Sequence, residues 1–164
     1  MTGDRGVGDL LLGGGTSEAA VSRVSASLCA QAARNAGWDA AEIEVDRDIA
    51  VKLRELSPAR VFNALHGQIG EDGNIQGLLN IMNIPYTHSG LTASAIAMDK
   101  LLAKKLMAGA GIVVPPTLDL IEDSKVYPED STGEQVIKPR NEGYSLGVGI
   151  VQDNRRRTNS RING

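Results

Sequence analysis

A histidine lies in a glycine-rich loop directly after an apolar run, in the segment NALHGQIGEDG at residues 63–73. A solvated turn needs no histidine, and a buried histidine needs no flanking glycines. The position of His66 after a predicted strand therefore favours ligand binding or proton transfer over a structural or merely exposed role. Glu71 and Asp72 could bind a metal ion, but one histidine and two adjacent acids form no recognisable metal-ligand spacing.

The turn Gly13–Gly15, followed by Thr16 and Ser17, is a second candidate. A helix that begins there would offer free amides and a partial positive charge to an anion. The turn lacks the glycine spacing of a dinucleotide-binding fingerprint and the lysine of a Walker loop. Taken alone, it predicts a tight strand-to-helix turn, and Glu18 is then only a favourable partner of the helix dipole.

Lysines occur in two settings. Lys100, Lys104 and Lys105 fall on a predicted helix, where lysines ordinarily form a solvated face. Lys138 instead follows two apolar residues of a predicted strand and precedes Pro139, so its ammonium group is expected to be partly held in place.

The segment NEGYSLG follows Lys138 and contains Gly143, Ser145 and Gly147. Backbone amides of such a loop could fold over phosphate oxygens. A lysine beside a glycine loop suggests nucleotide binding, and an ordinary hairpin turn accounts for the pattern equally well. The arginines at 155–157 have no interleaved aromatics, so they predict a solvated tail and no nucleic-acid site.

Alternating strands and amphipathic helices predict an α/β fold with a doubly wound parallel sheet. The expected strands lie within 7–15, 41–45 and 60–65. Four helices are expected. The first is capped by Thr16 or Ser17, has Val21, Val24 and Leu28 on one face and stops at Gly37, and the second has Ile49, Leu53 and Leu56 on one face and is ended by Pro58. The third is capped by Asp72 and has Ile75, Leu78, Leu79 and Met82 on one face, and the fourth runs from about Thr92 to Ala110. In such sheets ligands gather at the carboxyl ends of strands, where the Gly13–Gly15 turn and the His66 loop are both expected.

We expect three regions along the chain. Residues 1–98 form an amino-terminal α/β domain, residues 99–151 begin a second domain, and residues 152–164 form a disordered tail with almost no apolar side chains. The segment VIKPRNEGYSLGVGIV predicts two strands joined by a glycine-containing loop, a hairpin rather than another crossover unit.

Composition is that of a globular protein with an aliphatic core. Apolar residues make up 41% of the chain and aromatics only 3%. A formal charge of -3 gives no general attraction to nucleic acid or to anionic membranes. The single Cys29 cannot form an internal disulfide, and no stretch approaches the ~20 apolar residues of a membrane span, so a cytoplasmic protein is expected.

Several motifs in one order resemble the D-alanine–D-alanine ligases of the ATP-grasp superfamily. They are GGTSE, NALHGQIGEDGNIQGLL, IPYTHSG, SAIAMDK and VIKPRNEGYSLGV, and they cover about Leu10 to Val151. The resemblance implies an amino-terminal domain of the pre-ATP-grasp type, followed by the start of an ATP-grasp domain. It implies that ATP phosphorylates one D-alanine, and that the amine of a second attacks the acyl phosphate to give a dipeptide for peptidoglycan synthesis.

The resemblance also assigns roles to residues. Lys100 and Lys138 match lysines that offset the charge of the ATP phosphates, and Gly143, Ser145 and Gly147 match the loop that covers them. His66 matches a histidine beside the transferred phosphate, and Glu18 matches the acid that anchors the ammonium of the first D-alanine. The residues expected at the catalytic centre are Glu18, His66, Tyr144 and Ser145.

This sequence departs from the family pattern in places. Tyr144 stands where the family usually has a serine that helps to fix the acid, and a phenol there would crowd the substrate. Between Ser17 and Val21 the loop is one residue shorter than usual. The acidic Mg²⁺ ligands, the adenine pocket and an arginine are expected beyond residue 164, so no metal ligand is predicted within the chain. A homodimer is a further implication.

Two other hypotheses stay open at this point. The first is a non-catalytic remnant of such a ligase that folds without turning over substrate. The second is a generic ATP-binding module, whose nucleotide binding would be indifferent to D-alanine, whereas a ligase couples the two.

Overall fold

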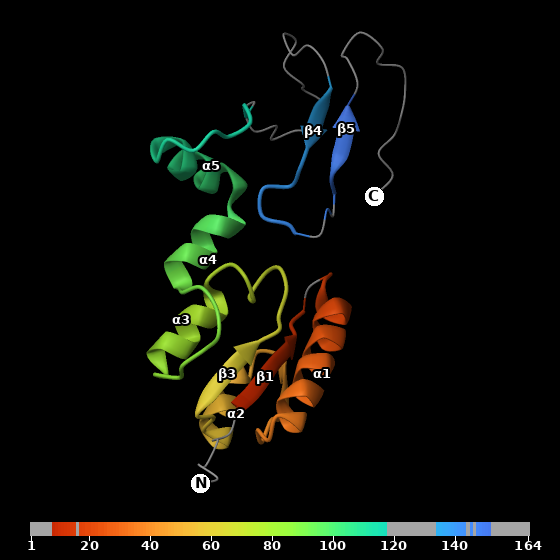
Figure 1. The fold of residues 1–164 in the computed structure, drawn as a ribbon, viewed down its shortest axis with the longest axis vertical. Helices are drawn as coiled ribbons and strands as arrows, with labels where there is room; N and C mark the ends of the chain where they lie inside the picture. Colours follow the sequence, from red (N-terminus) through yellow and green to blue (C-terminus); the bar gives the residue numbers. More distant parts are fainter. Residues whose placement is uncertain (1–7, 16, 118–133, 144, 146, 152–164) are drawn as a thin grey trace.

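A sheet with helices on both faces forms one end of the molecule, and two short helices with a hairpin form the other (Figure 1). The computed structural model describes residues 8–15, 17–117, 134–143, 145 and 147–151. Its elements in chain order are β1 (Gly8–Gly13), α1 (Ala19–Asn35), β2 (Glu42–Val45), α2 (Ile49–Leu56), β3 (Arg60–Asn63), α3 (Asn74–Ile81), α4 (Leu91–Met98), α5 (Lys100–Gly109), β4 (Gln135–Ile137) and β5 (Gly149–Val151).

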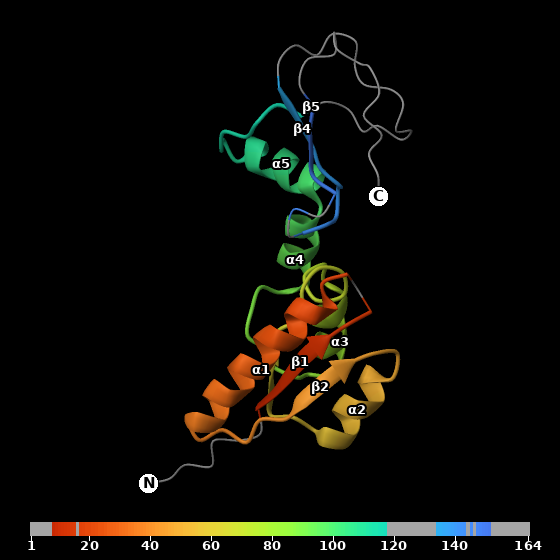
Figure 2. The same cartoon turned by 90° about the vertical axis from the view of Figure 1, so that its right-hand side faces the viewer.

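The sheet is parallel, with strand order β2-β1-β3. Its central strand β1 is aliphatic and buried on both faces, as expected where helices cover both sides. Leu11 packs with the residues of α2 and α3, whereas Leu10 and Leu12 pack with alanines that include those of α1. Figure 2 shows α1 and α2 on opposite sides of the strands. Tyr86 adds an isolated parallel bridge to Val61 at the edge of β3.

The buried face of α1 differs from the predicted one. Val21, Val24 and Leu28 were expected to face the core, but they are exposed, and the helix buries Ser22, Ala26 and Ala30 instead. Small side chains let the helix axis approach β1 closely, and this close approach decides the face more strongly than side-chain hydrophobicity. The predicted stripe of larger apolar residues is therefore wrong.

The start of α1 also corrects the prediction. The helix begins at Ala19, with Glu18 at the N-cap position and no side-chain capping hydrogen bond, so Ser17 is not the cap. Thr16, the alternative, lies outside the described residues. At the other end Gly37 has a φ of +85°, which confirms the predicted left-handed stop.

The middle helices follow the predictions in part. Helix α2 ends at Leu56, before Pro58, and buries Ile49 and Leu53, but Leu56, which was expected on the same face, is exposed. In α3, Ile75 and Leu79 are buried while Leu78 and Met82 pack against the same core. The N-cap of α3 is Gly73, so Asp72 is not the cap; it lies one position earlier, where its Oδ1 accepts from the Asn74 N–H at 3.1 Å.

The single helix expected from about Thr92 to Ala110 is two helices, α4 and α5. Asp99 has extended backbone angles and its carboxylate accepts from the N–H groups of Leu101 and Leu102, so it ends one helix and caps the next. Periodicity could not reveal this break, since alanine, leucine and lysine favour helix on both sides of it.

The hairpin beyond α5 is confirmed: β4 and β5 pair antiparallel. The domain boundary near residue 98 stays a prediction, and the expected tail at 152–164 lies outside the described residues. Among the described helices, none is both long and apolar enough to cross a lipid bilayer.

Candidate active site

Glu18 is buried at the carboxyl end of β1, just where α1 begins. Only 3% of the residue surface is exposed. Neither carboxylate oxygen has a hydrogen-bond partner among the described residues. Burial raises the pKa of Glu18, the nearby Glu71 and Glu142 raise it further, and His66 opposes them. A buried acid without a partner is costly for a folded chain, so this carboxylate requires a functional explanation.

Two glycines from distant parts of the sequence form walls against this carboxylate. At Gly67, with a φ of +67°, a methyl group would overlap the Glu18 Oε2 atom. At Gly143, a Cβ would lie 3.0 Å from Oε1. The glycine at Gly67 therefore allows the His66 loop to approach an acidic side chain of the protein closely.

His66 lies beside Glu18 at the carboxyl end of β3. Its Nε2 is 3.3 Å from the Ser25 Oγ, and its Nδ1 is 3.9 Å from a carboxylate oxygen of Glu71. The side chain is 20% exposed, so one ring can touch both solvent and the interior. Ser25 was not predicted, although it follows Glu18 by seven residues and so lies on the same face of α1.

The His66 loop holds its own shape. The Gly67 N–H donates to Glu71 Oε2 at 2.7 Å, and the Glu71 N–H donates back to the Gly67 carbonyl at 2.9 Å. Ile69 has a φ of +72°, which is strained for a β-branched residue. Such strain persists only where the surroundings fix the backbone, and it is typical of functional loops.

Ser22 lies one helical turn after Glu18 and stabilises the same end of the sheet. It is fully buried, its Oγ accepts from the Gly13 N–H at 2.9 Å, and it donates to the Ala64 carbonyl at 2.8 Å. One hydroxyl therefore joins the carboxyl ends of β1 and β3. Sequence reasoning missed it, because a serine among helical alanines gives no signal of its own.

Lys100 joins α5 to the hairpin loop. Its Nζ donates to the Glu142 carbonyl at 2.5 Å and to the Arg140 carbonyl at 3.3 Å. Arg140 in turn pairs with Asp99, and this hydrogen-bonded pairing lowers the pKa of Asp99 to about 2. The residue after Glu142 is Gly143, so these contacts tie Lys100 to the hairpin loop next to the glycine that faces Glu18.

The other predicted phosphate-binding residues lie along the hairpin. Lys138 follows β4 directly and is exposed, which contradicts the expectation that its ammonium is partly held. Ser145 and Gly147 have φ values of +60° and +65°. At Gly147 a Cβ would lie 2.8 Å from Pro139 Cγ, so the loop turns tightly there. Tyr144 lies outside the described residues.

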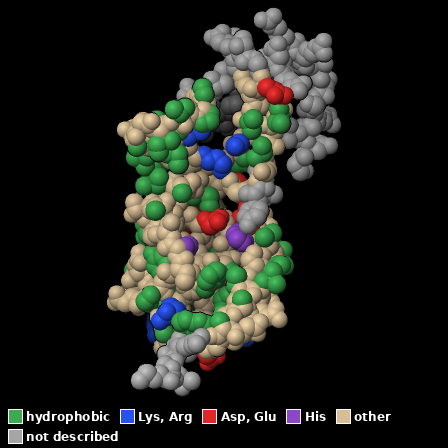
Figure 3. All heavy atoms as spheres, viewed as in Figure 1, with side chains coloured by type: hydrophobic (Ala, Val, Ile, Leu, Met, Phe, Trp, Pro, Cys, Tyr) green, Lys and Arg blue, Asp and Glu red, His purple; other side chains and the backbone are tan. Residues whose placement is uncertain are grey.

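The structure thus brings together Glu18, His66 and Gly143, and Lys100 contacts the backbone of Glu142 next to Gly143. Figure 3 shows acidic and histidine side chains gathered midway along the molecule, with basic side chains just beyond them. No group of three or more His, Cys, Asp and Glu side chains within the described part of the chain could hold a metal ion.

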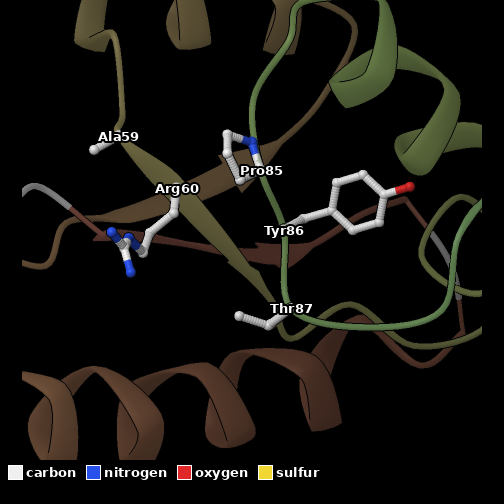
Figure 4. Close-up of a pocket in the computed structure, with 5 residues that line it drawn as sticks. All are labelled: Ala59, Arg60, Pro85, Tyr86 and Thr87. Atoms are coloured by element: carbon white, nitrogen blue, oxygen red, sulfur yellow. The ribbon is translucent and has the colours of Figure 1, made fainter.

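A separate shallow pocket lies at the opposite end of β3. Ala59, Arg60, Pro85, Tyr86 and Thr87 line it (Figure 4). The guanidinium of Arg60 stacks over the Trp38 ring at 4.8 Å and is therefore engaged elsewhere. This pocket holds none of the predicted site residues.

Comparison with known proteins finds similarity to D-alanine–D-alanine ligases. Residues 42–89 match the family model described as D-ala D-ala ligase N-terminus. The D-alanine–D-alanine ligase of Zymomonas mobilis is 48% identical over 145 residues, which are 88% of this chain and 45% of the relative. Over its matched length the chain is similar to the amino-terminal half of D-alanine–D-alanine ligases. It spans about half the length of the curated relatives that it matches.

Solved ligase structures show the same fold. A D-alanine–D-alanine ligase from Bacillus anthracis superposes with a TM-score of 0.77 at 29% identity, covering 89% of this chain and 49% of that one. The same organism's ligase complexed with ATP gives a TM-score of 0.74 at 27% identity, covering 91% of this chain and 51% of that one. The predicted fold class, a doubly wound parallel sheet followed by the start of an ATP-grasp domain, is confirmed.

Proposed function

We propose that this chain forms the D-alanine-binding half of an ATP-dependent D-alanine–D-alanine ligase. The observation that carries the proposal is the buried carboxylate of Glu18, which has no hydrogen-bond partner among the described residues. An ammonium group bound there would supply the missing opposite charge and hydrogen-bond donors. The ligase relatives make D-alanine the amino acid that we expect to bring it.

The geometry around Glu18 suits a small substrate. Gly67 and Gly143 leave no side chain between the carboxylate and the two loops that close on it. A substrate held by its ammonium at Glu18 would place its own carboxylate within the neighbourhood of His66, which can donate a hydrogen bond to an anion. His66 would thereby hold the carboxylate that is to be phosphorylated.

Lys100 and the hairpin loop fit a phosphate-bearing second substrate. ATP would supply the phosphoryl group that activates the D-alanine carboxylate. Lys100 reaches the hairpin loop beside Gly143, and Lys138 is exposed with its charge available to solvent or ligand. Ser145 and Gly147 have positive φ values, and loops with such residues can present backbone amides to phosphate oxygens. These residues would position phosphates and offset their charge, as phosphoryl transfer requires.

The remaining parts of the proposal are what the family resemblance of the sequence implies. They are Mg²⁺ beside the phosphates, a role in peptidoglycan synthesis, a cytoplasmic location where ATP is available, and a homodimer. No interaction with nucleic acid or membrane is part of the proposed function. Mg²⁺ would require ligands beyond those that the described residues supply.

Two measurements on the 164-residue chain test the proposal. Calorimetry should detect binding of D-alanine but not of propionate, which is the same molecule without its ammonium group. Release of phosphate that requires both D-alanine and ATP would establish ligation by this polypeptide. Equal binding of propionate would contradict the role of Glu18. Binding of D-alanine without phosphate release would leave a binding domain that does not turn over, and ATP binding indifferent to D-alanine would favour a generic nucleotide module.

A further inference from the structure

A closed ring of polar atoms lies under the His66 loop, and none of its side chains was predicted to matter. The side-chain amide nitrogens of Asn63 and Gln76 each donate to the Gly70 carbonyl oxygen at 2.8 Å. The same two nitrogens lie 2.6 Å and 2.9 Å from the Nε2 atom of His88. Four groups from β3, the loop, α3 and the connection after α3 therefore meet at one point.

The orientation of the Asn63 amide is fixed from both ends. Its Oδ1 accepts from the Leu65 N–H at 3.1 Å, so its Nδ2 must be the atom that faces Gly70. Reversing the amide would place two N–H donors against each other at Leu65 and two oxygens against each other at Gly70. Both contacts would be repulsive.

The Gln76 amide is fixed by the same carbonyl. Gln76 is fully buried, and its Nε2 must face the Gly70 oxygen because the alternative sets two acceptors 2.8 Å apart. Each amide nitrogen has two hydrogens. One from each side chain occupies the Gly70 oxygen, and the second hydrogen of each points to His88.

These orientations determine the state of His88. Its Nε2 faces two N–H donors, so it must be the acceptor, and the ring must be neutral with its proton on Nδ1. A proton on Nε2 would face a carbonyl whose two lone pairs are already used. Burial lowers the pKa of His88, while Gly70 and Glu71 oppose the shift. The Tyr86 ring packs edge-on at 5.2 Å, and Glu71 is the charged group that acts on His88.

The carbonyl held in this ring belongs to Gly70, which cannot move independently of its neighbours. At Gly70 a Cβ would overlap the side chain of Leu65 and lie 2.9 Å from its carbonyl carbon. Gly70 is three residues from Gly67, whose N–H and carbonyl both bond to Glu71. Moving the Gly70 carbonyl would therefore move the part of the loop that touches Glu18.

We propose that His88 is a positioning residue for the candidate active site. Its unprotonated Nε2 holds the amides of Asn63 and Gln76, and these amides fix the Gly70 carbonyl and with it the loop that carries His66. The effect on substrate binding rests on the proposed function. The effect on the loop does not, because it follows from the contacts alone.

The test compares two substitutions of His88 in the 164-residue chain. His88→Gln keeps an acceptor oxygen near the position of Nε2, whereas His88→Leu removes it. The readouts are hydrogen exchange of the Gly67 and Glu71 amides, D-alanine affinity between pH 5.5 and 8, and the nitrogen shifts of the His88 ring, which report its tautomer. His88 is exposed apart from the part of its ring that contacts Asn63, Gln76 and Tyr86, so neither change should unfold the chain.

In the original protein we expect the Nε2 atom of His88 to be unprotonated at pH 7.5. As the pH falls and His88 takes up a proton, the protection of the loop amides against hydrogen exchange should weaken. His88→Leu should speed amide exchange about tenfold at pH 7.5, the effect of losing one or two neutral hydrogen bonds, and this difference from the original protein should shrink as the pH falls. His88→Gln should restore protection and remove the part of the pH dependence that comes from this ring.

The inference is overturned if Nε2 carries the proton at pH 7.5, or if His88→Gln is no better than His88→Leu in the exchange experiment. If the original protein binds no D-alanine while the exchange pattern holds, the proposed function fails and the positioning of the loop stands. If it binds D-alanine and both variants bind it equally well, the role of His88 in substrate binding is refuted.

Discussion

Replacing Glu18 by glutamine should make the chain more stable and less able to bind D-alanine. The residue is 3% exposed and neither oxygen has a partner among the described residues. Two other acids raise its pKa further, so the charged form is costly at neutral pH. A buried unsatisfied polar group costs about 1–3 kcal/mol, and more when it is charged. Glutamine keeps the shape and removes the charge, so we expect a gain of about 1–2 kcal/mol at pH 7.

The stability gain of Glu18→Gln should depend on pH, whereas a gain from better packing would not. Because the pKa of Glu18 is raised on folding, the unfolded chain gives up the proton first as pH rises above the ordinary value of 4.5. Stability is therefore lost as the pH rises from that value through the raised pKa. The advantage of Glu18→Gln should be absent below pH 4.5 and should grow to a plateau above the raised pKa.

Thermal unfolding of the two proteins between pH 4 and 8 would measure the effect, and Glu55→Gln is the control. Glu55 is exposed on α2, so its charge is already solvated and its removal should change little. For a chain of this size, 1 kcal/mol corresponds to a shift in Tm of about 2–4 °C. A variant less stable than the original at pH 7, or a gain that does not change with pH, would refute the reasoning.

Three further substitutions test other parts of the account. Gly70→Ala should destabilise the chain by about 1–3 kcal/mol in denaturant titrations, because its methyl group would overlap Leu65. The control Gly109→Ala, with open space around the added methyl group, should be neutral or stabilising. Lys138→Ala should weaken ATP binding without changing the fold, whereas Lys105→Ala should leave the affinity unchanged in the same calorimetric titration. Asp99→Asn should increase amide exchange at the start of α5, because a neutral side chain caps and pairs less strongly. The pKa of Asp99 is lowered to about 2, so in the original protein this protection should persist at neutral pH and disappear as the pH falls from 3.8 through that value.

The sequence predicts the strands of this fold well, because aliphatic runs between glycine turns leave few alternatives. It also predicts that the Gly13–Gly15 turn and the His66 loop lie together, because the carboxyl ends of parallel strands meet at one edge of a sheet. The family resemblance adds Glu18 to this site. Helix faces are harder. The closely packed face of α1 consists of alanines and Ser22, which carry a weaker hydrophobic signal than Val24 on the opposite side.

The sequence pattern does not identify residues that act by fixing the shape of a loop. Asn63, Gln76 and His88 lie 13 and 12 positions apart, and only the folded loop brings their side chains to the Gly70 carbonyl. The break at Asp99 is similar, since its partner Arg140 is 41 residues away. In both cases the deciding contact is tertiary, and local propensity gives no sign of it.

The backbone amide signals of Gly67 and Gly143 test the central claim most directly, because these glycines come from different loops and both abut the Glu18 carboxylate. Titration with D-alanine should shift both signals with one common Kd in the original protein. Propionate should shift neither, and Glu18→Gln should abolish the response. Equal shifts with propionate, or a response to D-alanine that survives in Glu18→Gln, would contradict an ammonium site at this acid.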